Sequence, residues 1–153
     1  MIQTPRLTIR MASDDEMRIM MESEKDPEMI KAYGEMLSFS AASPELRQWY
    51  AAWLIELPDG ERIGDLCFKG LDPAGMAEIG YGLLPEYWGK GYATEAVRAM
   101  VQWASEQPNV KRIEAETEEN YAASQRVLQK VGFVPLNKNG EEGPRFIWQG
   151  KFL

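Results

Sequence analysis

The chain has 153 residues, 44% of them hydrophobic and 27% charged, and is therefore long enough to bury a sizeable core within one domain. Its formal net charge of −7 argues against a basic nucleic-acid-binding surface and favours cationic ligands such as amines. Because it contains no histidine and one cysteine, a Cys–His nucleophile, a histidine metal site and an internal disulfide are excluded.

The sequence contains no segment typical of membrane insertion or export. Its longest apolar stretches are far too short to span a bilayer. Residues 1–28 are rich in acidic side chains and lack the charged-then-apolar layout of a secretory signal. We therefore expect a cytoplasmic protein that contacts neither a membrane nor nucleic acid.

The chain opens with signals for a strand and then a helix. Alternating apolar residues favour a strand over 7–11. Ser13 and Glu16 form a capping box, which predicts a helix through about Lys25.

Two more helix starts follow, each with a capping side chain before a proline. Asp26-Pro27 predicts a short helix toward Tyr33, and Ser43-Pro44 repeats the signal. This part of the chain should therefore be helical.

A hairpin comes next. Residues 51–57 and 62–69 are predicted to be strands joined across the turn sequence Pro58-Asp59-Gly60. Cys67 lies in the second strand, where it is interpreted as a packed small hydrophobe rather than a nucleophile.

Residues 77–84 predict a strand that has glycines on only one face. That face carries Glu78, Gly80, Gly82 and Leu84, and the other carries Ala77, Ile79, Tyr81 and Leu83. The two glycines leave a bare strip of backbone, which predicts a bulge or the close approach of an extended ligand chain.

The segment 88–96, WGKGYATEA, has the composition of an anion-binding loop that opens a helix. Gly89 and Gly91 lack the Cβ atoms that would keep a phosphate from the free N–H groups of the helix, and the lysine between them adds a positive charge. Thr94 is predicted to cap this helix, and Pro108 to end it. The loop lacks the glycine spacings of the nucleotide P-loop and of the dinucleotide fingerprint.

The last third of the chain predicts a strand over 110–117, a helix over 121–131 that ends at Gly132, and a final strand over 145–152. Strands and helices therefore alternate along the chain. This order predicts a mixed sheet covered on both faces, without internal repeats.

Three segments resemble the GNAT family of acyl-CoA N-acyltransferases. Residues 88–93 match its pyrophosphate loop, Gln/Arg-x-x-Gly-x-Gly/Ala, except that Trp88 replaces the first residue. Residues 4–10, TPRLTIR, and 124–133, SQRVLQKVGF, are similar to the branch that contains the ribosomal-protein N-terminal acetyltransferases.

The chain departs from that branch before Ser124. The branch has an asparagine three residues before this serine, whereas Asn120 lies four residues before it and Tyr121 fills the asparagine position. Either the loop holds an extra residue or Asn120 does not have its usual role.

The resemblance implies an α/β (α+β) fold: one domain over residues 1–153 with a mixed, mostly antiparallel sheet, helices on both faces and a central splayed pair of parallel strands. It also implies metal-independent transfer of an acetyl group from acetyl-CoA to a primary amine, on a small molecule or a peptide N-terminus, by direct attack in a ternary complex. The enzyme would be a monomer or homodimer. Residues expected to bind acetyl-CoA are Leu83, Leu84, Trp88, Gly89, Lys90, Gly91, Tyr92, Ala93, Thr94 and Asn120.

Three residues are the main candidates for catalysis, and a fourth is weaker. Ser124 occupies the branch's serine position and is expected to protonate the departing thiolate, with Tyr121 as another hydroxyl donor. Glu116 is the candidate base, and Glu78 is a weaker one. The alternative roles are structural: a serine in a first helical turn, solvated strand glutamates and a packed aromatic ring.

Two other functions compete with acetyl transfer. The first is a CoA-binding sensor or inactive module of the same fold, which the displaced Asn120 favours. The second is a nucleotide-binding phosphotransferase, which the absence of a Walker-type Lys-Ser/Thr and of an adjacent magnesium carboxylate pair disfavours.

Overall fold

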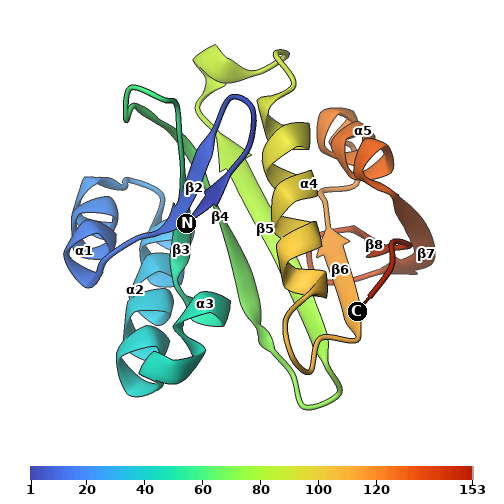
Figure 1. Ribbon diagram of the computed structural model, residues 1–153, viewed down its shortest axis with the longest axis horizontal. Coiled ribbons are helices and arrows are strands. Elements are labelled where there is room, and N and C mark those ends of the chain that lie inside the picture. Colours follow the sequence, from blue (N-terminus) through green and yellow to red (C-terminus); the bar gives the residue numbers. More distant parts are fainter. Residues whose placement is uncertain (153) are drawn as a thin grey trace.

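The computed structural model describes residues 1–152 and contains an eight-stranded sheet flanked by helices (Figure 1). The strands are β1 (Ile2–Gln3), β2 (Thr8–Met11), β3 (Ala52–Glu56), β4 (Arg62–Leu71), β5 (Met76–Leu83), β6 (Arg112–Glu116), β7 (Phe133–Asn139) and β8 (Pro144–Trp148). The α-helices are α1 (Asp14–Ser23), α2 (Pro27–Ala42), α3 (Arg47–Tyr50), α4 (Tyr92–Ser105) and α5 (Ala122–Val131).

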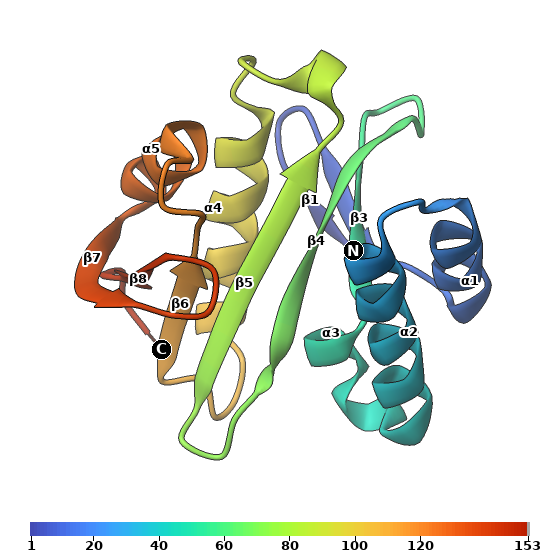
Figure 2. The same cartoon turned by 180° about the vertical axis from the view of Figure 1, so that it is seen from behind.

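The sheet is mostly antiparallel, as expected. Its strand order is β1-β2-β3-β4-β5-β6-β8-β7, and β5 and β6 form the parallel pair in its centre. Helix α4 lies across the face seen in Figure 1, with α5 beside it, whereas α1 and α2 cover the opposite face, which Figure 2 shows. The predicted α/β fold with helices on both faces is therefore confirmed.

Each face of the sheet has its own apolar core. Val97, Met100 and Val101 of α4 are fully buried against Ile79 and Ile113 of the central strands. On the other face, methionines of α1 and α2 pack over β3 in a second cluster. Together the two cores fix the sheet between its helices.

The parallel pair separates toward the end of β5. Pairing with β6 runs from Met76–Arg112 to Ile79–Ala115, and residues 80–83 of β5 extend beyond it. The backbone of this extension therefore has no β6 partner. It is the part of β5 that lines the cavities described below.

Capping residues and turn sequences predicted the ends of several helices and strands correctly. Ser13 and Glu16 form the predicted capping box at α1. The predicted hairpin joins β3 to β4, with Gly60 in the left-handed region at φ 89°. Gly132 ends α5 at φ 111°, also in that region.

The helix that starts at Asp26-Pro27 is longer than predicted, since it continues past Tyr33 to Ala42. Gly34 is a weak helix former, but a Cβ at Gly34 would lie 3.6 Å from Met21 Sδ of the neighbouring helix α1. Packing of α2 on α1 and β3 therefore maintains a helix that local propensity would end.

Strand β7 was not predicted, and the last strand spans Pro144–Trp148 instead of the predicted 145–152. Pro135 interrupts the apolar pattern of β7. The proline is tolerated because β7 is an edge strand that pairs with β8 alone.

Within residues 1–152, no helix is both long and apolar enough to cross a membrane.

Candidate active site

The loop before α4 has the backbone geometry of an anion cradle. Gly89 and Gly91 have φ values of 74° and 83°, in the left-handed region that favours glycine. The first bond of α4 runs from Glu95 N to Gly91 O, so the amides of residues 92–94 have no acceptor within the helix. These N–H groups and the helix dipole can bind an anion.

A cavity of about 380 Å³ adjoins this cradle and is bounded by the end of β5, α4 and α5. It brings together most of the residues expected to bind acetyl-CoA: Leu83, Trp88, Gly89, Gly91, Tyr92, Ala93 and Thr94. The prediction that Thr94 caps α4 is wrong, because the helix begins at Tyr92 with Gly91 as its N-cap. Thr94 lies instead in the first turn, where it lines the cavity.

Three other expected residues do not line this cavity. Leu84 lies beyond the end of β5 and is 43% exposed. Lys90 holds its ammonium 5.9 Å from the centre of the Tyr87 ring. Asn120 is exposed, whereas Tyr121 lines the cavity. The structure thus brings Tyr121, rather than Asn120, to the site.

The cradle is held by residues from the start of the chain, a contact that was not predicted. Arg6 donates from Nη1 to the carbonyl of Lys90 at 3.0 Å and stacks 4.4 Å from the centre of the Tyr92 ring. Its Nε also pairs with Glu95 Oε1 at 2.7 Å. Thr4 donates to the same carboxylate. The TPRL segment therefore fixes the loop and the first turn of α4.

Two basic residues at this cavity were also missed. Arg126 and Lys130 lie one turn apart on α5 and both line it. They place positive charge beside the cradle in a chain of net charge −7. Their spacing within SQRVLQK was a signal that could have been recognised.

Ser124 lies in the cavity and contacts a residue not expected there. Its Oγ lies 2.7 Å from the hydroxyl of Tyr81, and either oxygen can be the donor. The Tyr81 hydroxyl can instead donate to Ser124 O, 3.2 Å away. Burial raises the pKa of the Tyr81 hydroxyl. The hydrogen bond with Ser124 lowers this pKa less strongly, and the nearby Tyr121 raises it slightly further. Tyr81 therefore stays protonated well above neutral pH and can supply a proton.

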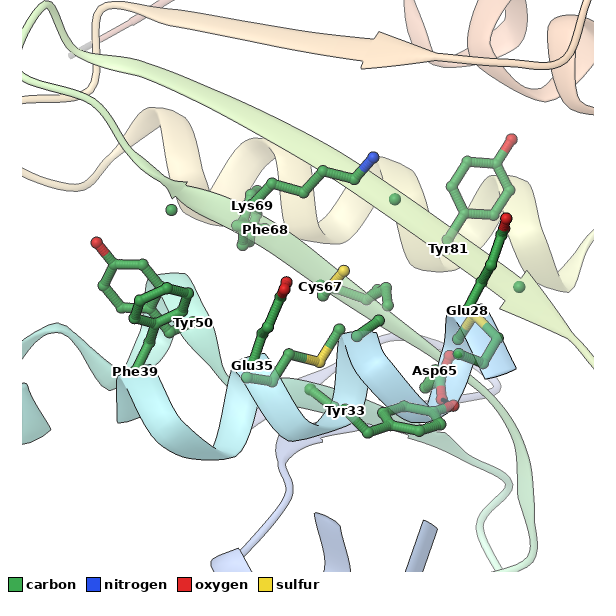
Figure 3. A pocket seen from close by; sticks show the side chains of 18 of the residues that line it. Glu28, Tyr33, Glu35, Phe39, Tyr50, Asp65, Cys67, Phe68, Lys69 and Tyr81 are labelled. Carbon is green, nitrogen blue, oxygen red and sulfur yellow. Dashed lines mark hydrogen bonds between the residues drawn. The ribbon is translucent and has the colours of Figure 1, made fainter. Parts of the chain in front are cut away.

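A second, larger cavity lies on the opposite face of the sheet. It has a volume of about 600 Å³ and is bounded by α2, β4 and β5 (Figure 3). Gly80 and Gly82, the predicted bare strip of β5, face this cavity. Tyr81 and Gly82 line both cavities, which therefore adjoin at the separated end of β5.

Asp65 is the most enclosed carboxylate of the larger cavity. It pairs in register with Gly82 and accepts a hydrogen bond from Tyr33 at 2.9 Å. Burial raises the pKa of Asp65, whereas Tyr33 and Arg62 lower it less strongly. A carboxylate with a raised pKa is suited to accept a proton near neutral pH. Asp65 was not among the predicted site residues.

Glu116 lies elsewhere, in a cluster of charges around Arg145. Arg145 pairs with Glu116 at 2.8 Å and with Glu78 at 2.9 Å. Burial opposes ionisation of Glu116, but hydrogen bonds from the Glu142 amide and Arg145 outweigh it and lower its pKa. Neither Glu116 nor Glu78 lines either cavity, and the lowered pKa makes Glu116 a weak base.

Cys67 lies in β4 beside the larger cavity. Burial raises the pKa of its thiol to about 11, so that it remains protonated at neutral pH. This agrees with the interpretation of Cys67 as a packed residue, because only the thiolate is strongly nucleophilic.

Comparison with known proteins identifies this architecture. The model of the acetyltransferase (GNAT) domain matches residues 4–134. YoaA of Bacillus subtilis, an uncharacterized N-acetyltransferase, is 30% identical over 144 residues, which cover 86% of this chain and 81% of YoaA. YjdG of the same organism, also an uncharacterized N-acetyltransferase, is 35% identical over 94 residues, which cover 60% of this chain and 56% of YjdG.

Solved structures share the fold. The crystal structure of an acetyltransferase from Agrobacterium tumefaciens superposes with a TM-score of 0.74 at 22% identity, over 97% of this chain and 94% of that protein. The chain therefore belongs to the GNAT family and is an acyl-CoA-dependent N-acetyltransferase.

Proposed function

We propose that the protein transfers the acetyl group of acetyl-CoA directly to a primary amine while both substrates are bound. The observation that carries this proposal is the junction of two cavities at Tyr81 and Gly82, one beside an anion cradle and one containing carboxylates. The cradle and the basic pair of α5 suit the pyrophosphate of CoA. The thioester would then lie at the junction, within reach of an amine in the larger cavity.

The reaction needs few protein groups. The amine nitrogen attacks the thioester carbonyl, the carbon–sulfur bond breaks, the nitrogen loses a proton to a base, and the departing thiolate gains one from an acid. Asp65 is our candidate base, in place of Glu116. Ser124 and Tyr81 are the acid, with Tyr121 as the other nearby hydroxyl.

If Asp65 is the base, activity should depend on its ionisation. The carboxylate accepts a proton only when ionised, so kcat/KM should fall as pH falls through its raised pKa, above the range of an ordinary aspartate. Asp65→Asn should lower kcat/KM by about 100- to 10,000-fold and abolish this inflection. A pH–rate profile of both proteins measures this.

Glu116→Gln provides the matched control, because it removes a carboxylate outside both cavities. It should retain the inflection. Loss of the inflection in Glu116→Gln together with its survival in Asp65→Asn would make Glu116 the base and Asp65 a structural partner of Tyr33.

Direct transfer places no acetyl group on the enzyme. Cys67→Ala is therefore expected to retain at least about half of the wild-type kcat, since the half-buried thiol stays protonated at neutral pH. Detection of acetylated Cys67 by mass spectrometry after incubation with acetyl-CoA would contradict direct transfer. Initial rates at varied concentrations of both substrates should give intersecting rather than parallel lines.

Acetyl transfer itself is tested with acetyl-CoA and a pooled library of primary amines, read as mass increases. The library should contain peptides, because residues 4–10 and 124–133 resemble the ribosomal-protein N-terminal acetyltransferases. Saturable binding of acetyl-CoA without modification of any amine would favour the sensor function instead.

A further inference from the structure

The larger cavity has two chemically different ends. In Figure 3, Tyr81, Glu28 and Asp65 lie at one end, and Phe39 and Tyr50 lie at the other. The first end adjoins the cavity beside the cradle, where the thioester would lie. An acceptor that spans the cavity would therefore present its amine to this end and its remainder to the aromatic end.

The charge of the cavity is negative. Four carboxylates line it, those of Glu28, Glu35, Asp65 and Glu142, against the single ammonium of Lys69. Lys69 is paired with Glu78 at 2.9 Å and Asp65 with Arg62 at 3.6 Å, so the remaining carboxylates set the sign of the charge. The cavity therefore attracts an ammonium group and repels a carboxylate.

The far end is apolar. The Phe39 and Tyr50 rings have centroids 5.4 Å apart, and Phe39 is 53% exposed even though it lies on a helix that covers the sheet. Met29 and Met36 extend this surface along α2, and methionine adapts readily to irregular apolar ligands. These four side chains carry no charge, and Glu35 is the labelled carboxylate nearest to the two rings in Figure 3.

We propose that the acceptor is a primary amine attached to an apolar group, with no carboxylate next to the amine. The preferred apolar group is aromatic. This inference rests on the proposed acetyl transfer. Free amino acids would bring their carboxylate among the acidic residues near the thioester. Linear polyamines lack an apolar body that could contact the exposed rings. A peptide N-terminus with an aromatic first residue also fits this acceptor class, because the carbonyl next to its amine belongs to a neutral amide.

The test compares four acceptors at saturating acetyl-CoA: 2-phenylethylamine, L-phenylalaninamide, L-phenylalanine and spermidine. We expect kcat/KM for the first two to exceed that for phenylalanine by at least about a hundredfold, because like-charge contacts are strongly unfavourable. Spermidine should be at least about tenfold poorer than 2-phenylethylamine. Equal or higher kcat/KM for phenylalanine or spermidine would overturn the inference.

Variants test the two ends separately. Phe39→Ala should raise KM for 2-phenylethylamine by about tenfold through lost apolar contact, with little change in kcat. Val134→Ala, which truncates a 40% exposed side chain outside the cavity, should leave KM unchanged. Glu28→Gln, which removes a carboxylate at the Tyr81 end, should narrow the difference in kcat/KM between phenylalaninamide and phenylalanine. An unchanged difference in the folded variant would contradict the charge argument.

Failure of this inference can be told apart from failure of the proposed function. If 2-phenylethylamine is not acetylated but another amine is, acetyl transfer stands and the acceptor class is wrong. If acetyl-CoA binds and no amine in the wider library gains an acetyl group, both the proposed acetyl transfer and the proposed acceptor class are wrong.

Discussion

Replacing Gly91 with alanine is expected to raise the dissociation constant of acetyl-CoA by about ten- to a hundredfold, from a value that we expect to be micromolar. Gly91 lies at φ 83°, and a Cβ there would lie 3.3 Å from Arg6 Nη2. An alanine would therefore strain the backbone and press on the arginine that holds the loop. Both effects would turn the N–H groups of the cradle away from the pyrophosphate. Isothermal titration calorimetry measures the change.

Gly60→Ala is the matched control. Gly60 lies at φ 89° in the β3–β4 turn, with nothing within 4 Å of its would-be Cβ. Each substitution should lower the free energy of unfolding by about 1–2 kcal/mol, since both force alanine into the left-handed region. Only Gly91→Ala should lose affinity. Equal affinity in both variants, or equally tight binding of ATP by the wild type, would refute the cradle assignment.

The cradle could be predicted from sequence because its causes are local. Two glycines, a lysine and the start of an amphipathic helix lie within a few residues of one another, and the structure places the glycines at positive φ directly before α4. What the loop contacts is not local. Arg6 lies far from Lys90 in the sequence, and no pattern in either segment indicates that they meet.

The catalytic base could not be identified from local sequence patterns. Alternation assigned Glu78 to the face opposite the apolar residues, but no pattern revealed that Arg145, on β8, pairs with both Glu78 and Glu116. Asp65 gave no signal in its own strand. Its relevance depends on strand register, which pairs it with Gly82, and on the packing of α2, which brings Tyr33 to it.

The same limit applies to Tyr81. The pattern of residues 77–84 placed it on the apolar face, where it would ordinarily be packing. It becomes a candidate acid because β5 outlasts its pairing with β6, so its hydroxyl meets Ser124 of α5. This separation of the parallel strands was expected from the family resemblance alone.

Ser124→Ala is expected to lower kcat by about ten- to a thousandfold while leaving the dissociation constant of acetyl-CoA nearly unchanged. When the Tyr81 hydroxyl donates to Ser124 Oγ, 2.7 Å away, the serine proton is free to pass to the departing sulfur. Tyr81→Phe removes the outer member of this pair and should lower kcat within the same range. Single-turnover kinetics and calorimetry measure the two quantities separately.

The double variant decides whether the two hydroxyls act as one unit. Residues that transfer one proton together give non-additive effects, so Ser124→Ala combined with Tyr81→Phe should be little slower than the slower single variant. Ser38→Ala, at an exposed serine of α2 outside both cavities, should retain wild-type kcat. A wild-type rate in Ser124→Ala would make this serine structural and leave Tyr81, Tyr121 or water as the donor. Fully multiplicative losses would mean instead that the hydroxyls contribute independently, so the 2.7 Å contact would not be a proton path.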